Sequence, residues 1–245
     1  MIEPDLSGRT ALVTGSARGI GRELLLSLAD CGAAVAVNYH TSDDEAAAVA
    51  ERAGEFGVET TTVQGDVTDP TAVDELFTVV EGELGAVDIL VNNVGAFAPS
   101  HWEEISFETW NRVLETNLNG TYLCAKRALP GMREREWGRI VNIGYASADR
   151  LLVSPKNFPY FVAKAGVVMF TRMLAADTQD DGITVNAVSP YVVENSAVFP
   201  DDLPRGRPAD FEDMVQAVRF FLDEDSDYLS GQNVAVDGGW RPERV

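Results

Sequence analysis

The sequence predicts an α/β protein with a single domain over residues 1–245, in which a doubly wound parallel sheet of about seven strands carries helices on both faces. Short apolar runs rich in β-branched residues alternate with amphipathic helical patterns along almost the whole chain. No tract rich in proline, glycine or serine divides the chain into two parts. Because parallel strands need crossover helices, this alternation favours a sheet covered on both sides.

Seven runs are short, apolar and bounded by turn residues, which is typical of buried strands. They cover residues 10–14, 33–39, 60–64, 88–92, 139–143, 184–189 and 233–236. Between them, apolar residues recur on one helical face in two clear sets, Ile20, Leu24, Leu25 and Leu28, and Phe211, Met214, Val215, Val218 and Leu222. Such sheets bind ligands beyond the carboxyl ends of their strands, so a site is expected there.

The composition predicts a globular cytoplasmic protein. Hydrophobic residues make up 45% of the 245 positions, which is enough for a substantial core and argues against extended disorder. No stretch approaches the roughly 18 consecutive apolar residues of a membrane span, and the first residues lack the basic and apolar regions of a signal peptide. We expect no membrane partner.

The charge is strongly acidic, because the net charge is -20 and only three of the 19 basic residues are lysine. Such a surface repels phosphate backbones, so we expect no nucleic-acid partner. An acid excess with almost no lysine is typical of proteins that work in concentrated salt, where self-repulsion is screened, and we interpret the chain as halophilic. An acidic enzyme of an ordinary cell is the alternative.

Metal and disulfide chemistry are not indicated. Cys31 and Cys124 lie in apolar segments without a CxxC pattern, and His40 and His101 are isolated. We therefore expect no metal site.

A glycine-rich turn follows the first predicted strand and leads into an apolar-periodic helix; it reads Thr14-Gly15-Ser16-Ala17-Arg18-Gly19-Ile20-Gly21. Glycines here let a pyrophosphate approach backbone N–H groups at the positive end of the helix. A turn that only reverses the chain is the alternative. The strand-turn-helix context favours a dinucleotide site in a Rossmann-like sheet.

The end of the second predicted strand favours NADP over NAD. An NAD site usually has a carboxylate about 20 residues after the glycines. Here the segment reads Asn38-Tyr39-His40-Thr41-Ser42, and the first acid is Asp43. Arg18 is placed to meet a 2′-phosphate, with His40 and Ser42 as neighbouring donors. A solvated Arg18 without a ligand is the alternative.

Several motifs in order resemble the short-chain dehydrogenase/reductase family, in particular its 3-oxoacyl reductases. They are the Gly15/Gly19/Gly21 spacing, Gly65-Asp66-Val67, Asn92-Asn93-Val94-Gly95, Asn117, the pair Tyr160 and Lys164, and Val236-Asp237-Gly238-Gly239. The resemblance covers essentially the whole chain. It implies that Asp66 and Val67 contact the adenine and that Pro190 and Val193 flank the nicotinamide.

The predicted cofactor contacts are Gly15, Ser16, Arg18, Ile20, Gly21, Asn38, Tyr39, His40, Asp66, Val67, Asn93, Gly95, Tyr160, Lys164, Pro190 and Val193. Structural roles are the alternative for some motif residues. Asn92 and Asn93 can tie strand ends together, and Gly238-Gly239 can form a turn.

Tyr160 and Lys164 lie four residues apart in an apolar helical pattern, which puts them on one helix face. A neighbouring ammonium and an oxidised nicotinamide are expected to lower the tyrosine pKa from about 10, as acid-base catalysis near neutral pH requires. The resemblance implies that Tyr160 protonates a carbonyl oxygen while hydride reaches the carbon. It also implies that Lys164 holds the nicotinamide ribose and that Asn117 positions a water. An isolated Tyr–Lys pair would ordinarily be a surface contact.

The chain departs from the family at its catalytic serine. Aligning the fifth strand puts Tyr145 at that position, whereas counting back the usual thirteen residues from Tyr160 reaches Ser147. We favour Tyr145, because strand register is constrained by pairing while the following segment, with Ser154 and Asn157, can absorb an insertion. A phenolic hydroxyl donates from farther out, which narrows the pocket.

A second departure follows the sixth predicted strand, in Ser189-Pro190-Tyr191-Val192-Val193-Glu194-Asn195. We expect Tyr191 to abut the nicotinamide and Asn195 to replace a family threonine that contacts its carboxamide. Residues 191–210 are predicted to form a short substrate loop, with Arg205 and Arg207 as the candidate anchors for a carboxylate. The substrate pocket is therefore expected to be open.

These observations predict an NADPH-dependent ketoreductase for a 3-oxoacyl thioester or small ketone, with Tyr160, Lys164, Asn117 and Tyr145 as catalytic residues. One alternative is an NAD(P)-dependent secondary-alcohol or sugar dehydrogenase. Because the serine is missing, a non-catalytic NADP-binding sensor or partner subunit is another. Residues 107–129 and 160–176 are more apolar than one sheet face needs, and the resemblance implies a homotetramer or homodimer. Simple core packing is the alternative.

Overall fold

The computed structural model describes residues 2–148, 155–196 and 198–240. Its strands are β1 (Thr10–Val13), β2 (Ala34–Tyr39), β3 (Thr60–Gln64), β4 (Ile89–Asn92), β5 (Gly138–Ile143), β6 (Ile183–Pro190) and β7 (Asn233–Val236). No end differs from the predicted strands by more than one residue. All neighbours pair in parallel, in the order β3-β2-β1-β4-β5-β6-β7. The predicted seven-stranded, doubly wound Rossmann-like sheet is confirmed.

The helices that connect these strands are α1 (Gly19–Asp30), α2 (Asp43–Gly54), α3 (Pro70–Glu83), α4 (Phe107–Leu114), α5 (Gly120–Glu134), α6 (Phe158–Asp177) and α7 (Phe211–Leu222). Local sequence explains where several of them begin. Asp69 accepts hydrogen bonds from two N–H groups of the first turn of α3, and Asp210 and Asp213 form a reciprocal capping box at α7.

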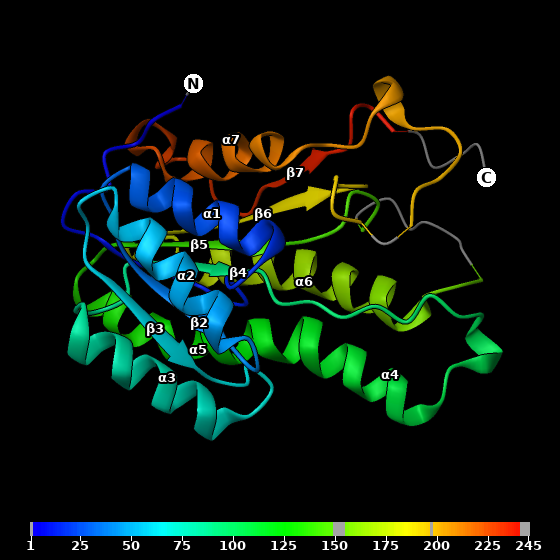
Figure 1. Ribbon diagram of the computed structural model, residues 1–245, viewed down its shortest axis with the longest axis horizontal. Helices are drawn as coiled ribbons and strands as arrows, with labels where there is room; N and C mark the ends of the chain where they lie inside the picture. The colour runs from blue at the N-terminus through cyan, green and yellow to red at the C-terminus, as the bar shows by residue number, and fades with distance from the viewer. Residues whose placement is uncertain (1, 149–154, 197, 241–245) are drawn as a thin grey trace.

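The sheet lies between two layers of helices (Figure 1). Successive residues of a strand point to opposite faces, so each layer packs on a different set of strand side chains. On one face, Leu24 and Leu28 of α1 and Val215 of α7 pack with Val13 and Val35. On the other, Leu12 and Leu90 pack in a second cluster with side chains of α3, α5 and α6, among them Phe77, Met132 and Leu174. Both predicted apolar helix faces therefore face the sheet.

The apolar stretch of residues 107–129 does not form one continuous α-helix. Between α4 and α5 lies one π-helical segment, η2 (Glu115–Asn119), which the apolar pattern did not indicate. Within it, Asn117 is fully buried, and its side-chain Nδ2 donates to the carbonyl oxygens of Val113 and Ala96, both at 2.9 Å. The amide thus fixes this wide turn, and such turns are frequent at functional sites.

Among the described residues, α6 alone is long and apolar enough to cross a membrane by length and composition. Half of its apolar stretch is buried in the protein, as in the core helix of a globular fold. The described ranges contain no group of three histidine, cysteine, aspartate or glutamate side chains that could hold a metal ion. Within the predicted domain, residues 1, 149–154, 197 and 241–245 lie outside the described ranges; these include Ser154 of the expected insertion and one position of the predicted substrate loop.

Candidate active site

A cavity of about 1150 Å³ lies beyond the carboxyl ends of β1 to β4. This is the edge where doubly wound sheets bind ligands. It is lined by most of the predicted cofactor contacts, namely Gly15, Arg18, Ile20, Gly21, Asn38, Tyr39, His40, Asp66, Val67, Asn93 and Gly95. Ser16, Tyr160, Lys164, Pro190 and Val193 are not among its described lining residues.

The glycine turn forms a cradle that other residues would fill. Gly15 and Gly19 have φ values of 63° and 58°, a region that glycine adopts without strain. A Cβ on Gly21 would come within 2.5 Å of Asn93 Nδ2 and 2.6 Å of the Gly15 carbonyl oxygen. Because α1 begins at Gly19, its positive end faces this space. The cradle fits the pyrophosphate of a dinucleotide.

Buried polar side chains hold the cradle in place. Asn38 Oδ1 accepts a hydrogen bond from the Gly15 N–H at 3.0 Å, and Ser16 Oγ accepts one from the Asn38 N–H at 3.1 Å. Asn93 Nδ2 donates to the carbonyl oxygen of Thr14 at 3.0 Å. Asn92 binds Asn142 across β4 and β5. The side chains of Ser16 and Asn38 thus position the turn. Both asparagines of the Asn92-Asn93 motif tie strand ends, and Asn93 also lines the cavity, where its contact with a cofactor stays a prediction.

The far end of the cavity carries the charges expected to recognise a ribose. His40 Nε2 lies 3.9 Å from Asp66 Oδ2, and both side chains are exposed. Partial burial acts to raise the pKa of Asp66, but hydrogen bonds from the N–H and hydroxyl of Thr68, together with His40, lower it below its usual value. Arg18 is exposed on the cavity wall.

Asn117 and Lys164 lie beside Gly95, which lines this cavity, and Tyr160 lies next to Lys164. Lys164 Nζ lies 5.7 Å from the centre of the Tyr160 ring and donates to the Ile143 carbonyl oxygen at 2.6 Å. A Cβ built on Gly95, which lines the cavity, would lie 3.0 Å from Asn117 Oδ1 and 3.8 Å from Lys164 Nζ. Asn117 Oδ1 is buried without a hydrogen-bond partner among the described residues. An orphaned acceptor beside an ammonium is a place for a water or a ligand hydroxyl.

Lys164 does not lower the pKa of Tyr160 in the protein alone, and the lowering expected from a bound oxidised nicotinamide stays a prediction. Burial, with a smaller contribution from Tyr145, raises the pKa of Tyr160 above its usual value. Burial also lowers the pKa of Lys164 to about 8. The physical reason is that both groups lie in the interior, where the charged form of each is poorly solvated, and Lys164 Nζ is directed to the Ile143 carbonyl. Tyr160 is therefore held as a neutral phenol.

The ring of Tyr145 lies against that of Tyr160. The two tyrosine rings meet edge to face with centroids 5.7 Å apart. Ser147 is buried, and its Oγ has no hydrogen-bond partner among the described residues. Backbone bonds from Gly144 to Val188 and from Ala146 to Pro190 continue the β5–β6 pairing through this turn. This pairing supports the strand register that puts Tyr145 at the serine position.

The segment after β6 closes over the sheet edge. Pro190 ends β6, and the buried Val193 donates its N–H to Ser196 Oγ at 3.0 Å. Asn195 lines the cofactor cavity, and its Nδ2 lies 2.8 Å from the position of a Cβ on Gly19, beside the glycine turn. Its contact with the nicotinamide carboxamide stays a prediction.

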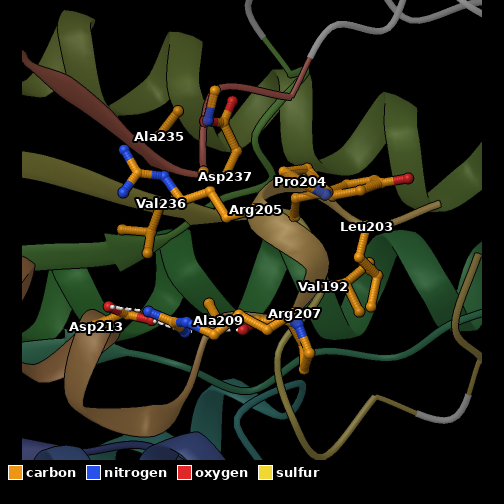
Figure 2. A pocket seen from close by; sticks show the side chains of 14 residues that line it. Val192, Leu203, Pro204, Arg205, Arg207, Ala209, Asp213, Ala235, Val236 and Asp237 are labelled. Atoms are coloured by element: carbon orange, nitrogen blue, oxygen red, sulfur yellow. Dashed lines mark hydrogen bonds and ion pairs between the residues drawn. The ribbon is translucent and has the colours of Figure 1, made fainter.

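A second cavity, of about 360 Å³, lies between the loop of residues 191–210 and β7 (Figure 2). Arg207 crosses its floor to Asp213, with Nη1–Oδ2 at 2.6 Å. Arg205 lines the same cavity and has no ion pair or hydrogen bond with the described residues. Gly238 and Gly239 line it too and form the predicted turn, in which the Gly239 N–H binds Asp237 Oδ1.

Sequence reasoning missed two aromatic residues at this site. Phe97 stacks on Tyr160 with centroids 4.3 Å apart, and Trp240 stacks on Tyr191 at 3.8 Å. Phe97 had a signal, because it follows the Asn92-to-Gly95 motif by two residues. Trp240 had none, because only the fold brings the end of β7 beside Tyr191.

Known proteins share both the sequence and the fold. The sequence profile of the family described as Enoyl-(Acyl carrier protein) reductase matches residues 15–241. The 3-oxoacyl-[acyl-carrier-protein] reductase FabG of Staphylococcus epidermidis is 35% identical over 241 residues, covering 94% of this chain and 98% of that protein. FabG of Vibrio harveyi is 34% identical over 245 residues, covering 96% of this chain and 98% of that protein.

Two solved structures agree. A protein of Agrobacterium tumefaciens described as a gluconate dehydrogenase has a TM-score of 0.90 at 34% identity and covers 98% of each chain. One of Sinorhizobium meliloti described as a short-chain alcohol dehydrogenase has a TM-score of 0.90 at 30% identity, covering 96% of this chain and 97% of that one. The chain therefore belongs to the short-chain dehydrogenase/reductase family, in its 3-oxoacyl reductase-like part, whose members are oxidoreductases that act on CH–OH and C=O groups with a nicotinamide cofactor.

Proposed function

We propose that the protein is an NADPH-dependent ketoreductase that converts a carbonyl group, of a 3-oxoacyl thioester or a small ketone, to a secondary alcohol. The observation that carries this proposal is that Asn117 and Lys164 lie beside Gly95 of a glycine-lined cavity, with Tyr160 next to Lys164. The cradle around Gly15 and Gly21 and the orphaned Asn117 Oδ1 fit a dinucleotide. When bound, the reduced nicotinamide supplies the hydride to the carbonyl carbon.

The side chains of this chain supply the proton and the positioning. A neutral phenol carries a proton that it can give up, so Tyr160 would protonate the carbonyl oxygen during reduction. Lys164 lies within reach of the cavity at Gly95 and would hold the nicotinamide ribose. Asn117 Oδ1 would hold a water that returns a proton to Lys164 and Tyr160. Tyr145 would donate a hydrogen bond to the substrate oxygen.

The preference for NADP rests on the residues around the ribose end of the cavity. Arg18, His40 and Ser42 all line it, and no acid lies at the end of β2 before Asp43. A guanidinium and a hydroxyl favour a phosphate over a free ribose hydroxyl. The remaining predicted contacts, from Asp66 and Val67 to Pro190 and Val193, would complete the adenine and nicotinamide ends.

Two rival functions can be distinguished from the proposed one by the measurements described below. The Agrobacterium tumefaciens relative described as a gluconate dehydrogenase favours an NAD(P)-dependent sugar or secondary-alcohol dehydrogenase. Tyr145 at the serine position favours a non-catalytic NADP-binding sensor or partner subunit. We further infer a cytoplasmic, halophilic protein with one domain over residues 1–245, which assembles as a homotetramer or homodimer and has a small carbonyl compound, not a nucleic acid or membrane, as its partner.

The test is NADPH oxidation by the purified protein in high salt, with 3-oxoacyl thioesters, 2-enoyl thioesters, small ketones and sugars as substrates. We expect turnover of a 3-oxoacyl thioester or a ketone. Replacing Tyr160 by Phe should lower it by about 10²–10⁴-fold without changing the dissociation constant for NADPH. Tyr122→Phe, on exposed α5 surface, is the matched control. Normal NADPH binding with no turnover of any substrate would support the sensor, and turnover of alcohols with NAD alone would support the dehydrogenase.

A further inference from the structure

Aromatic rings enclose the proposed proton donor on several sides. Phe97 stacks on the ring of Tyr160 with centroids 4.3 Å apart and planes 26° apart. Tyr145 meets the same ring edge-on at 5.7 Å, and Phe161 does so at 5.8 Å. Tyr160 itself is 5% exposed. The ring of Tyr160 is thus packed among aromatic side chains.

Phe97 is the member of this group that faces outward. Its side chain is 59% exposed although it is large and apolar. It is held next to the cofactor cavity, because Gly95 and Ala96 line that cavity and the Ala98 N–H donates to Asn157 Oδ1 at 2.9 Å. An exposed aromatic ring at the mouth of a site gains free energy when a ligand covers it. Its position suits contact with the substrate.

The aromatic surface continues away from Tyr160. Tyr145 lies 6.4 Å from the ring of Tyr191 and 6.4 Å from that of Trp240, and those two rings stack at 3.8 Å with planes 12° apart. Tyr191 also lines the second cavity, whose wall includes Leu203 and Pro204 (Figure 2). An apolar surface thus runs from the proton donor to a space large enough for a small substituent.

We propose that the substrate carbonyl carries a flat apolar group, such as an aryl ring, and that Phe97 and Tyr145 determine this specificity. This inference rests on the ketoreductase function proposed above. A flat apolar group gains offset or edge-to-face contacts with these rings. A sugar would instead lose water from those of its hydroxyls that lie against the rings of Phe97 and Tyr145, where the rings offer no equivalent partners, and this disfavours its binding beside Tyr160. Phe97 and Tyr145 thereby favour a ketone with a flat apolar group over a sugar.

The experiment compares an aryl methyl ketone with a small aliphatic ketone in the full-length protein with NADPH. We expect Phe97→Ala to lower kcat/KM for the aryl ketone by about three- to tenfold through KM, and to leave the aliphatic ketone within about twofold. Phe97→Tyr retains a ring and should restore the preference. Phe107→Ala is the matched control, because Phe107 is 79% exposed at the start of α4 and has no ring contact among the described residues.

A second readout is binding without turnover. In the Tyr160→Phe background, the dissociation constant of the aryl ketone should rise by the same factor when Phe97 is also replaced by Ala. An unchanged aryl-to-aliphatic ratio in Phe97→Ala would overturn the inference while leaving ketone reduction intact. Efficient sugar turnover would overturn it as well. Absence of any carbonyl reduction in the wild type would instead overturn the proposed function on which it rests.

Discussion

Lys164 Nζ donates a hydrogen bond of 2.6 Å to the carbonyl oxygen of Ile143, the last residue of β5. This bond joins the middle of α6 to the sheet at the strand end where Tyr145 follows. Lys164 is buried, and desolvation lowers its pKa to about 8. The ammonium is thus held at a cost to the folded state, in a place where a neutral side chain would pack more easily.

The first prediction concerns pH and stability. The pKa of Lys164 is depressed on folding, so the unfolded chain binds more protons between pH 8 and the ordinary lysine pKa of about 10.5. The destabilisation of the folded state by the buried ammonium of Lys164 is therefore complete below pH 8 and is lost as the pH rises toward 10.5. Relative to Lys164→Met, the free energy of unfolding of the wild type should rise by about 2–3 kcal/mol from pH 7 to pH 10.

Urea denaturation at constant salt measures this difference, and subtraction of the variant removes contributions of other titrating groups. Lys126→Met, which changes an exposed lysine, is the control and should show no such trend. A wild-type advantage that does not change with pH would show that Lys164 keeps an ordinary pKa in the folded protein.

The second prediction separates Tyr145 from Ser147. Tyr145→Phe keeps the ring contacts with Tyr160 and removes only the hydroxyl, so turnover should fall by about 10- to 100-fold with little change in stability. Ser147→Ala removes a buried hydroxyl that has no partner among the described residues, so turnover and stability should stay the same or stability should rise slightly. Steady-state kinetics on both variants, with melting temperatures, check this. The opposite pattern would assign the role of the family serine to Ser147.

The fold could be predicted because its signals are local and repeated. Each strand is a short apolar run, because both of its faces are buried. Leu12 and Val13 are adjacent in β1, and they pack in the core clusters on opposite faces of the sheet. The glycine turn could be predicted for a similar local reason. Gly21 lies so close to Asn93 that a larger residue would not fit, so the glycine must appear in the sequence.

The site was less predictable, because it depends on distances through space. The π-helical turn that buries Asn117 depends on a bond to Ala96, which lies 21 residues away in the sequence. The raised pKa of Tyr160 follows from burial among rings contributed by separate segments, including Phe97 and Tyr145. The spacing of four residues on one helix predicted that Tyr160 lies near Lys164. It does not indicate how far either side chain is buried from water.

The third prediction tests the cofactor preference. Arg18 is exposed on the cavity wall and has no ion pair among the described residues, so it is available to a phosphate. Arg18→Leu should weaken NADPH binding by about 10- to 100-fold and leave NADH binding within about twofold, since charge-assisted hydrogen bonds contribute about 1.5–3 kcal/mol. Titration calorimetry in fixed salt provides both constants. Arg52→Leu, on the exposed end of α2, controls for loss of net charge. Equal weakening for both cofactors would mean that Arg18 binds the shared pyrophosphate.

The fourth prediction concerns the apolar surface of α6. Val162, Met169 and Met173 are 52%, 63% and 63% exposed, although methionine and valine ordinarily favour the interior. Tyr122 of α5 is 44% exposed and contacts Phe170 of α6, with ring centroids 6.3 Å apart, so the two helices present one surface. In a chain with a net charge of -20, apolar area of this kind is suited to association between copies.

We therefore expect a homo-oligomer in molar salt, and Met169→Glu with Met173→Glu should dissociate it, because each new carboxylate would be desolvated opposite its symmetry-related copy. Light scattering at micromolar concentration measures the mass. Val79→Glu, at a similarly apolar but separate position of α3 with 41% exposure, should leave the mass unchanged. A wild type that is monomeric under these conditions would leave this surface to another partner, and a double variant that keeps its oligomeric mass would locate the interface elsewhere. Lower salt should weaken the assembly of the wild type, because self-repulsion between the acidic copies is then no longer screened.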